Sequence, residues 1–133
     1  MKVLNRHTRI IKAPIHKTSE ILLTLGTVED RVWPIGKWPR MIFHQGMDIG
    51  ALGGHGPIRY TIKSKTPGKS IEFQFVKPKG FHGTHGFNIE GASESTTQIT
   101  HTIEMNTSFI GYMQWLLAIR WLHGDIQEYE IAI

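Results

Sequence analysis

Apolar and polar residues alternate strictly over most of the second half of the chain, which predicts a run of antiparallel strands. Successive side chains of a strand point to opposite faces, so residues of one parity share a face. The turn sequence Thr66-Pro67-Gly68-Lys69 separates two of these runs and indicates a hairpin. The apolar residues that share the expected buried face are Ile58, Tyr60, Ile62, Ile71, Phe73, Phe75, Phe81, Phe87, Ile89, Ile99, Ile103 and Met105.

The C-terminal stretch from Phe109 to Ile133 changes to helical spacing. Its apolar residues at steps of three and four are Tyr112, Trp115, Leu116, Ile119, Leu122 and Ile126. A helix with an apolar face that follows a run of strands must bury this face against a sheet. We therefore expect an α+β fold, in which a curved antiparallel sheet of about six strands grips a long C-terminal helix and leaves a pocket between them.

The start of the chain predicts one strand and two short helices. Val3 to Ala13 is typical of a strand that Pro14 ends, because proline has no N–H to donate. A first short helix is expected from Ile15 to Leu25, with Gly26 as its stop. Thr27 with Asp30 three residues later resembles a capping box, which indicates a second short helical turn.

The segment between these helices and the alternating strands is rich in Gly and Pro. Arg40 to Gln45 predicts a second strand, whereas the glycines around His55 favour a tight turn or a bulge. The pairs Trp33-Pro34 and Trp38-Pro39 leave two interpretations: large rings that plug one end of the core, or rings that cover the mouth of a cavity.

Length and composition favour one domain, residues 1–133, and the lack of cysteine is compatible with a reducing compartment. The absence of cysteine excludes disulfides and thiolate chemistry. No apolar signal segment opens the sequence, and the apolar run from Phe109 to Ile119 falls short of the ~18 to 20 residues that span a bilayer. We expect a cytoplasmic protein without a membrane span.

The net charge of +4 comes partly from basic residues in the middle of the chain, among which Arg59, Lys63 and Lys65 share one face of an expected strand. A phosphate-binding ridge would use such a row, but a solvated outer face has the same pattern. We favour the solvated face and expect no nucleic-acid partner.

Two histidines lie on otherwise apolar strand faces. His85 shares its parity with Phe87, and His101 shares its parity with Ile99 and Ile103. Because both faces must meet one core, only alternate registers of the hairpin are allowed. One register places His85 directly opposite His101, and the next places His101 opposite Phe87 with His85 diagonal to it.

Burying two imidazoles costs roughly 1–3 kcal/mol for each unmet hydrogen bond. Either each ring finds a partner in an ordinary core, or both face a wet or ligand-filled pocket. A metal site is not expected, because His82 and His85 point to opposite faces and no carboxylate lies on the inward face of either strand. No cofactor fingerprint, nucleophile elbow or Ser/His/Asp order is present.

Three stretches resemble a known superfamily. Ile11-Lys-Ala13-Pro14 leading into a short helix is similar to the opening of the START-like, helix-grip proteins, the polyketide cyclase/dehydrase and lipid-transport superfamily SRPBCC. The segments 52–60 and 81–85 look like motifs of an uncharacterised subgroup within it. The resemblance implies an apolar cavity between sheet and helix, with Ile11 and Ala13 inward and His7 and Arg9 toward the pocket. Its members bind lipids, hormones or polyketides, a few catalyse cyclisation or hydrolysis, and none of this implies a cofactor.

Three functions follow as hypotheses. The first is binding of a small, mainly apolar ligand of lipid, polyketide or aromatic type. The second is an aromatase/cyclase enzyme that uses His85 or His101 as general acid–base, and the third is an interaction or assembly module, including a homodimer. The residues expected to form the ligand site are Tyr60, Phe73, Phe75, His85, Phe87, His101, Trp115, Ile119 and, at the edge of the helix face, His123.

Overall fold

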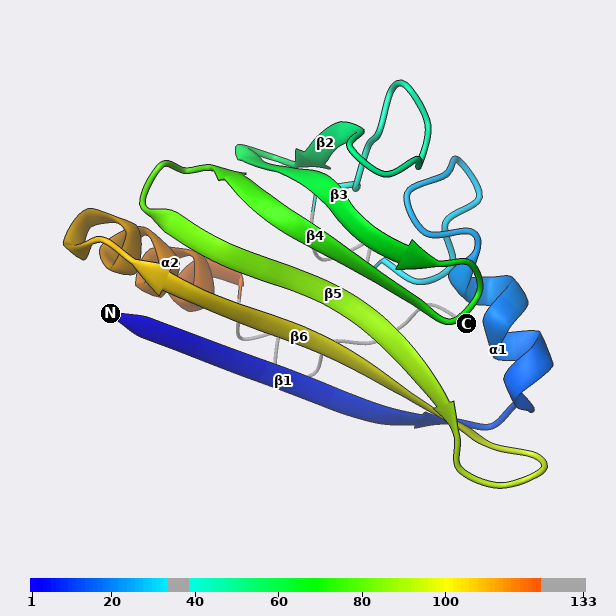
Figure 1. Cartoon of the computed structure of the whole chain (residues 1–133). Coiled ribbons are helices and arrows are strands. Elements are labelled where there is room, and N and C mark those ends of the chain that lie inside the picture. Colours follow the sequence, from blue (N-terminus) through cyan, green and yellow to red (C-terminus); the bar gives the residue numbers. More distant parts are fainter. Residues whose placement is uncertain (34–38, 123–133) are drawn as a thin grey trace.

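The computed structural model describes residues 1–33 and 39–122, with the backbone alone for 118–122. This part of the chain forms one antiparallel sheet of six strands and two α-helices (Figure 1). The sheet order is β1-β6-β5-β4-β3-β2, so β1 and β2 are the edges. The elements are β1 Lys2–Ile11, α1 Ile15–Leu22, β2 Leu52–His55, β3 Ile58–Thr66, β4 Ser70–Lys77, β5 Phe81–Gly91, β6 Thr97–Thr107 and α2 Phe109–Leu122.

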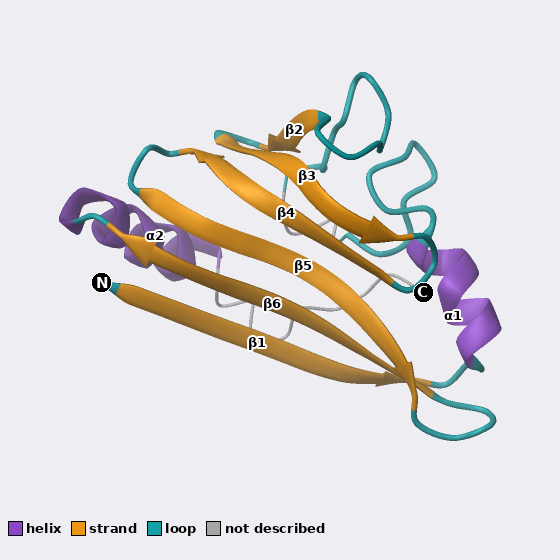
Figure 2. Cartoon of the chain, viewed as in Figure 1, coloured by secondary structure: helices purple, strands orange, loops and turns teal. Residues whose placement is uncertain are grey.

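The predicted alternation is confirmed, because the apolar residues of the strands lie on one face of the curved sheet and the polar residues lie mainly on the other. We call the buried face the inner face and the opposite one the outer face. The two helices lie near opposite ends of the sheet, α2 by the end of β6 and α1 by the end of β5 (Figure 2). The buried apolar residues that the strands contribute to the inner face are Val3, Ile11, Tyr60, Ile62, Ile71, Phe73, Phe75, Phe81, Phe87, Ile89, Ile99 and Met105.

Two glycines of β5 let this strand approach both neighbours closely. A Cβ on Gly83 would overlap the Glu104 carbonyl of β6, and a Cβ on Gly86 would overlap the Ile71 carbonyl of β4. Glycine in a strand often marks such a close approach of backbones. The segment Gly83-Thr84-His85-Gly86 thereby holds His85 tightly between β4 and β6.

Of the two short helices predicted before the glycine-rich segment, the first is confirmed as α1, whereas the second is wrong for the described residues. Helix α1 ends at Leu22, and turns follow through Gly26, whose φ is +76°. The Asp30 side chain does not cap a helix. Its Oδ2 accepts the N–H of Gly26 at 2.8 Å, and its Oδ1 accepts the N–H groups of Val32 and Trp33 at 2.8 and 2.9 Å. Short polar side chains that take backbone N–H groups in this way compete with helix formation.

The predicted strand Arg40–Gln45 is also wrong, because only one bridge forms there, between Ile42 and Gly54. The strand is instead Leu52–His55, within the segment that favoured a turn. A Cβ on Gly53 would overlap the Ile42 carbonyl and the Phe43 ring, so glycine allows this crossing. The close packing of two chain segments, rather than a bulge, accounts for this glycine.

Helix α2 begins at Phe109 as predicted, and its described part ends at Leu122. The Ser108 Oγ accepts the N–H of Gly111 at 3.0 Å, an N-cap contact. The long helix was predicted to continue to Ile133, and the part of this prediction beyond Leu122 falls outside the described residues. Leu116 was expected on the buried face, but it is 40% exposed. Neither helix within residues 1–33 and 39–122 has the length and apolar character to cross a lipid bilayer.

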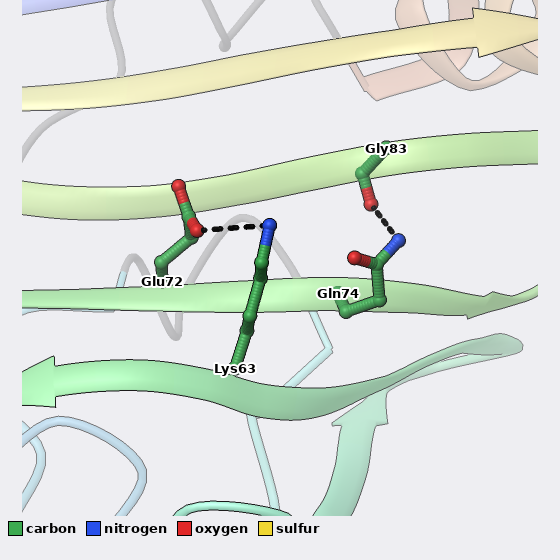
Figure 3. Close-up of polar contacts among 4 residues, drawn as sticks. All are labelled: Lys63, Glu72, Gln74 and Gly83. Carbon is green, nitrogen blue, oxygen red and sulfur yellow. Dashed lines mark hydrogen bonds and ion pairs between the residues drawn. The ribbon is translucent and has the colours of Figure 1, made fainter.

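The basic residues of β3 make local contacts. Lys63 lies 3.6 Å from the Glu72 carboxylate on the exposed surface, beside the bond from the Gln74 amide to the Gly83 carbonyl (Figure 3). The Lys65 ammonium donates to the Met47 carbonyl at 2.6 Å. A register shift between Ile62 and Ser64 interrupts the predicted shared face of these residues. This arrangement does not form a continuous phosphate-binding ridge.

Candidate functional site

A row of hydrogen-bonding side chains crosses the apolar inner face. It consists of His7 on β1, His101 on β6, His85 on β5, Tyr60 on β3 and His55 on β2, and we call it the histidine–tyrosine row. His7 lies directly opposite His101 in the ladder of β1 and β6, so both side chains are on the same face. His55, Tyr60, His85 and His101 are each at most 7% exposed.

The hairpin of β5 and β6 brings His85 and His101 together. His101 pairs with Phe87, and His85 pairs with Ile103, which is the second of the two predicted registers. The His101 Nε2 and the His85 Nδ1 are 3.5 Å apart, and the ring planes are nearly perpendicular at 83°. One proton shared along this contact makes one ring the donor and the other the acceptor.

His85 occupies the centre of an aromatic cage. Its ring centroid lies 4.3 Å from that of Tyr60, 4.8 Å from that of Phe73 and 5.0 Å from that of Phe75. Phe87, the fourth aromatic residue expected at the site, stacks on His101 at 4.5 Å. These aromatic residues therefore lie beside the two histidines, and their contact with a ligand stays a prediction.

At the other end of the row, His55 bonds Tyr60. The His55 Nδ1 and the Tyr60 hydroxyl are 2.7 Å apart. The Trp33 ring packs on His55 at 4.6 Å, and its Nε1–H donates to the Pro39 carbonyl at 2.9 Å. His55 was not expected at the site, because the surrounding glycines concealed strand β2. The alternation of apolar and polar residues begins at β3, after His55, so it gave no signal for this residue.

One polar atom of the cage has no hydrogen-bond partner within the part of the chain that the structure describes. This atom is the Nε2 of His85, which is fully enclosed. A buried polar atom without a partner costs roughly 1–3 kcal/mol. Such an atom in a native interior points to water or a ligand at that position.

The buried imidazoles of the row are held neutral. Burial lowers the pKa of His101 to about 3, and the nearby His7 and His55 rings add to this effect. Burial and the Arg59 guanidinium lower the pKa of His55 to about 3. The pKa of His85 is lowered well below its ordinary value, first by burial and then by His101 and His55. Near neutral pH these rings are uncharged donors and acceptors.

The remaining predicted site residues are only partly placed. Trp115 of α2 is half-buried and packs against the core. The Ile119 side chain and His123 lie outside the part of the structure that is described in full. Ile11 is buried as the resemblance implied, whereas Arg9 is exposed. Contact of any of these residues with a ligand remains a prediction.

No group of three or more His, Asp or Glu residues in 1–33 and 39–122 has a geometry that could hold a metal ion. The row itself contains no carboxylate, which is the usual partner of imidazole in a metal site. The arrangement is therefore suited to hydrogen bonding of a neutral group in an apolar setting.

No family model and no curated protein matches the sequence. Solved structures match well. Zhui aromatase/cyclase from Streptomyces sp. R1128 has a TM-score of 0.65 at 12% identity, over 97% of this chain and 91% of that chain. Norcoclaurine synthase from Thalictrum flavum has a TM-score of 0.64 at 8% identity, over 85% and 74%.

A third similar structure is the Aha1 dimer from Colwellia psychrerythraea, with a TM-score of 0.61 at 17% identity, over 98% of this chain and 97% of that chain. A likeness at identities this low is evidence for a shared fold and is not evidence for a shared activity. The chain therefore has the START-like, polyketide cyclase-like helix-grip fold that its sequence resembles.

Proposed function

We propose that this chain binds a small, mainly apolar molecule against the inner face of its sheet. His85 and His101 hydrogen-bond the polar group of that molecule, and Tyr60, Phe73 and Phe75 contact its apolar body. The observation that carries the proposal is the enclosed His85 Nε2, which has no hydrogen-bond partner within the described residues. A ligand atom at this position removes the cost of burying it.

The shared fold supports this function. Two structures with the fold are named as an aromatase/cyclase and a norcoclaurine synthase, so the architecture can house a site for small-molecule chemistry. Ligand pockets in proteins are mainly apolar with a few convergent polar groups. The aromatic cage around His85 has this composition.

Replacing His101 by Leu is expected to weaken retention of the bound molecule about tenfold, because one hydrogen bond of the histidine pair is lost. Native mass spectrometry of gently purified protein measures this as the fraction of chain that carries a small molecule. His82→Leu is the matched control, because His82 is exposed on the same hairpin and should leave occupancy unchanged. Equal occupancy in the two variants would show that His101 does not bind the molecule.

Catalysis by a pocket histidine is less favoured. General acid–base catalysis works best when the pKa of the group lies near the working pH. Burial lowers the pKa of His101 to about 3 and that of His85 well below its ordinary value. These rings are poor proton carriers near neutral pH, so their lowered pKa values favour binding over the aromatase/cyclase alternative.

Self-association is a second candidate function, because α2 exposes apolar side chains. Phe109 and Ile110 are 70% and 71% exposed, and Leu117 is 53% exposed. A protein with the same fold is named as a dimer. We expect light scattering to give the mass of a homodimer that Phe109→Lys shifts toward the monomer. A monomer mass at every concentration would rule out this homodimer.

A further inference from the structure

We propose that the bound molecule is uncharged and presents a hydroxyl group to the Nε2 of His85. This inference rests on the proposed ligand site and specifies which chemistry that site accepts. It depends on three properties of the inner face: where charges are absent, how the histidines are protonated, and what their shared proton allows.

The first property is the lack of a buried counter-charge. Among the buried side chains of residues 1–33 and 39–117, Asp30 alone is ordinarily charged. Both of its oxygens are occupied by the backbone N–H groups of Gly26, Val32 and Trp33. A charged ligand group moved into this interior would lose its hydration without gaining an ion pair. Neither a carboxylate nor an ammonium group is therefore accepted.

The second property is the neutral state of the row. A protonated imidazole would provide a positive charge for a carboxylate or phosphate. Burial, His101 and His55 lower the pKa of His85, and burial, His7 and His55 lower that of His101. The Arg59 guanidinium near His55 does not supply this positive charge, because its Nη2 donates to the Gly56 carbonyl on the exposed surface. The rings thus recognise a group by hydrogen bonding without charge.

The third property is the shared proton between His85 and His101. If the His85 Nδ1–H donates to the His101 Nε2, the His85 Nε2 is an acceptor; with the opposite polarity it is a donor. A hydroxyl group both donates and accepts, so it pairs with His85 in either tautomer. A carboxylate accepts only and cannot pair with the first tautomer.

The test compares three probes that share one ring system: 1-naphthol, 1-naphthoate and naphthalene. Titration calorimetry at neutral pH on the wild-type chain is expected to give the order naphthol, naphthalene, naphthoate. Naphthol should bind at least about tenfold more tightly than naphthoate, because only the anion is desolvated without a partner. Naphthoate binding as tightly as naphthol, or more tightly, would overturn the inference and leave the proposed ligand site intact.

The variant His85→Phe keeps an aromatic ring at this position and removes both ring nitrogens. It should abolish the preference for naphthol over naphthalene, whereas His82→Phe on the exposed side of the same strand should retain it. A preference that persists in His85→Phe would place the hydroxyl at another residue and contradict the proposal. If none of the three probes binds to the wild-type chain, the proposed ligand site itself fails, and that outcome is distinct from equal binding of naphthol and naphthoate.

Discussion

Lowering the pH from 7 to 5 is expected to bring this protein close to unfolding, because three buried histidines of the inner face resist protonation. Burial lowers the pKa of His55 and His101 to about 3, and it lowers that of His85 well below the ordinary value of 6.5. In the unfolded chain these rings are in water and take up protons as the pH falls through 6.5. The difference makes the free energy of unfolding depend on pH.

The sign follows from proton binding. Between about pH 3 and pH 6.5 the unfolded state binds more protons than the folded state, so the free energy of unfolding falls as the pH falls. The contribution is fully present above pH 6.5. One histidine loses about 1.4 kcal/mol per pH unit below 6.5, so three lose up to about 6 kcal/mol at pH 5. A natural domain has only about 5–15 kcal/mol in total.

Urea unfolding followed by tryptophan fluorescence at a series of pH values measures this slope. His101→Phe should flatten it by about a third, whereas His82→Phe, on the exposed face of β5, should leave it unchanged. A urea midpoint that is the same at pH 7 and pH 5 would show that the three rings are not buried in neutral form.

Asp30→Ala is expected to lower the free energy of unfolding by about 3 kcal/mol, because it leaves the buried N–H donors of the loop without an acceptor. The carboxylate accepts N–H groups from Gly26, Val32 and Trp33. The Trp33 ring packs on His55 at 4.6 Å, so the change also loosens one end of the histidine–tyrosine row.

The control for this variant is Asp48→Ala, because Asp48 is an exposed aspartate in the turn before β2. Its urea midpoint should match that of the wild type. Asp30→Asn should fall between the two, since its amide oxygen can accept the N–H groups of Val32 and Trp33 while its NH₂ faces the N–H of Gly26. An Asp30→Ala protein as stable as Asp48→Ala would mean that water satisfies these donors equally well.

The strands β3 to β6 and the start of α2 could be predicted, because each has a clear periodicity and short turns fix the order of neighbours. The same rule placed His85 and His101 on the buried face and limited their register to two alternatives. The length of the loop between β5 and β6 selects one of them, with His101 opposite Phe87. Loop length is decided by local turn geometry, which the serines and threonines of this segment leave open.

The segments 23–33 and 39–55 could not be predicted, because individual contacts that follow no period decide their structure. The Asp30 carboxylate accepts hydrogen bonds from backbone N–H groups on both sides of a turn. Gly53 allows the backbone at Ile42 to pack closely against it. Neither contact leaves a periodic pattern in the sequence. His55 was missed for the same reason, since its place in the row depends on the pairing of β2 with Tyr60 of β3.

A crystal structure of the gently purified chain, with whatever small molecule it retains, tests the central claim most directly. We expect an uncharged molecule against the inner face, with a hydroxyl oxygen about 2.7–3.2 Å from the His85 Nε2. A protein group bonded to that nitrogen, with side chains filling the space between the sheet and α2, would contradict the account.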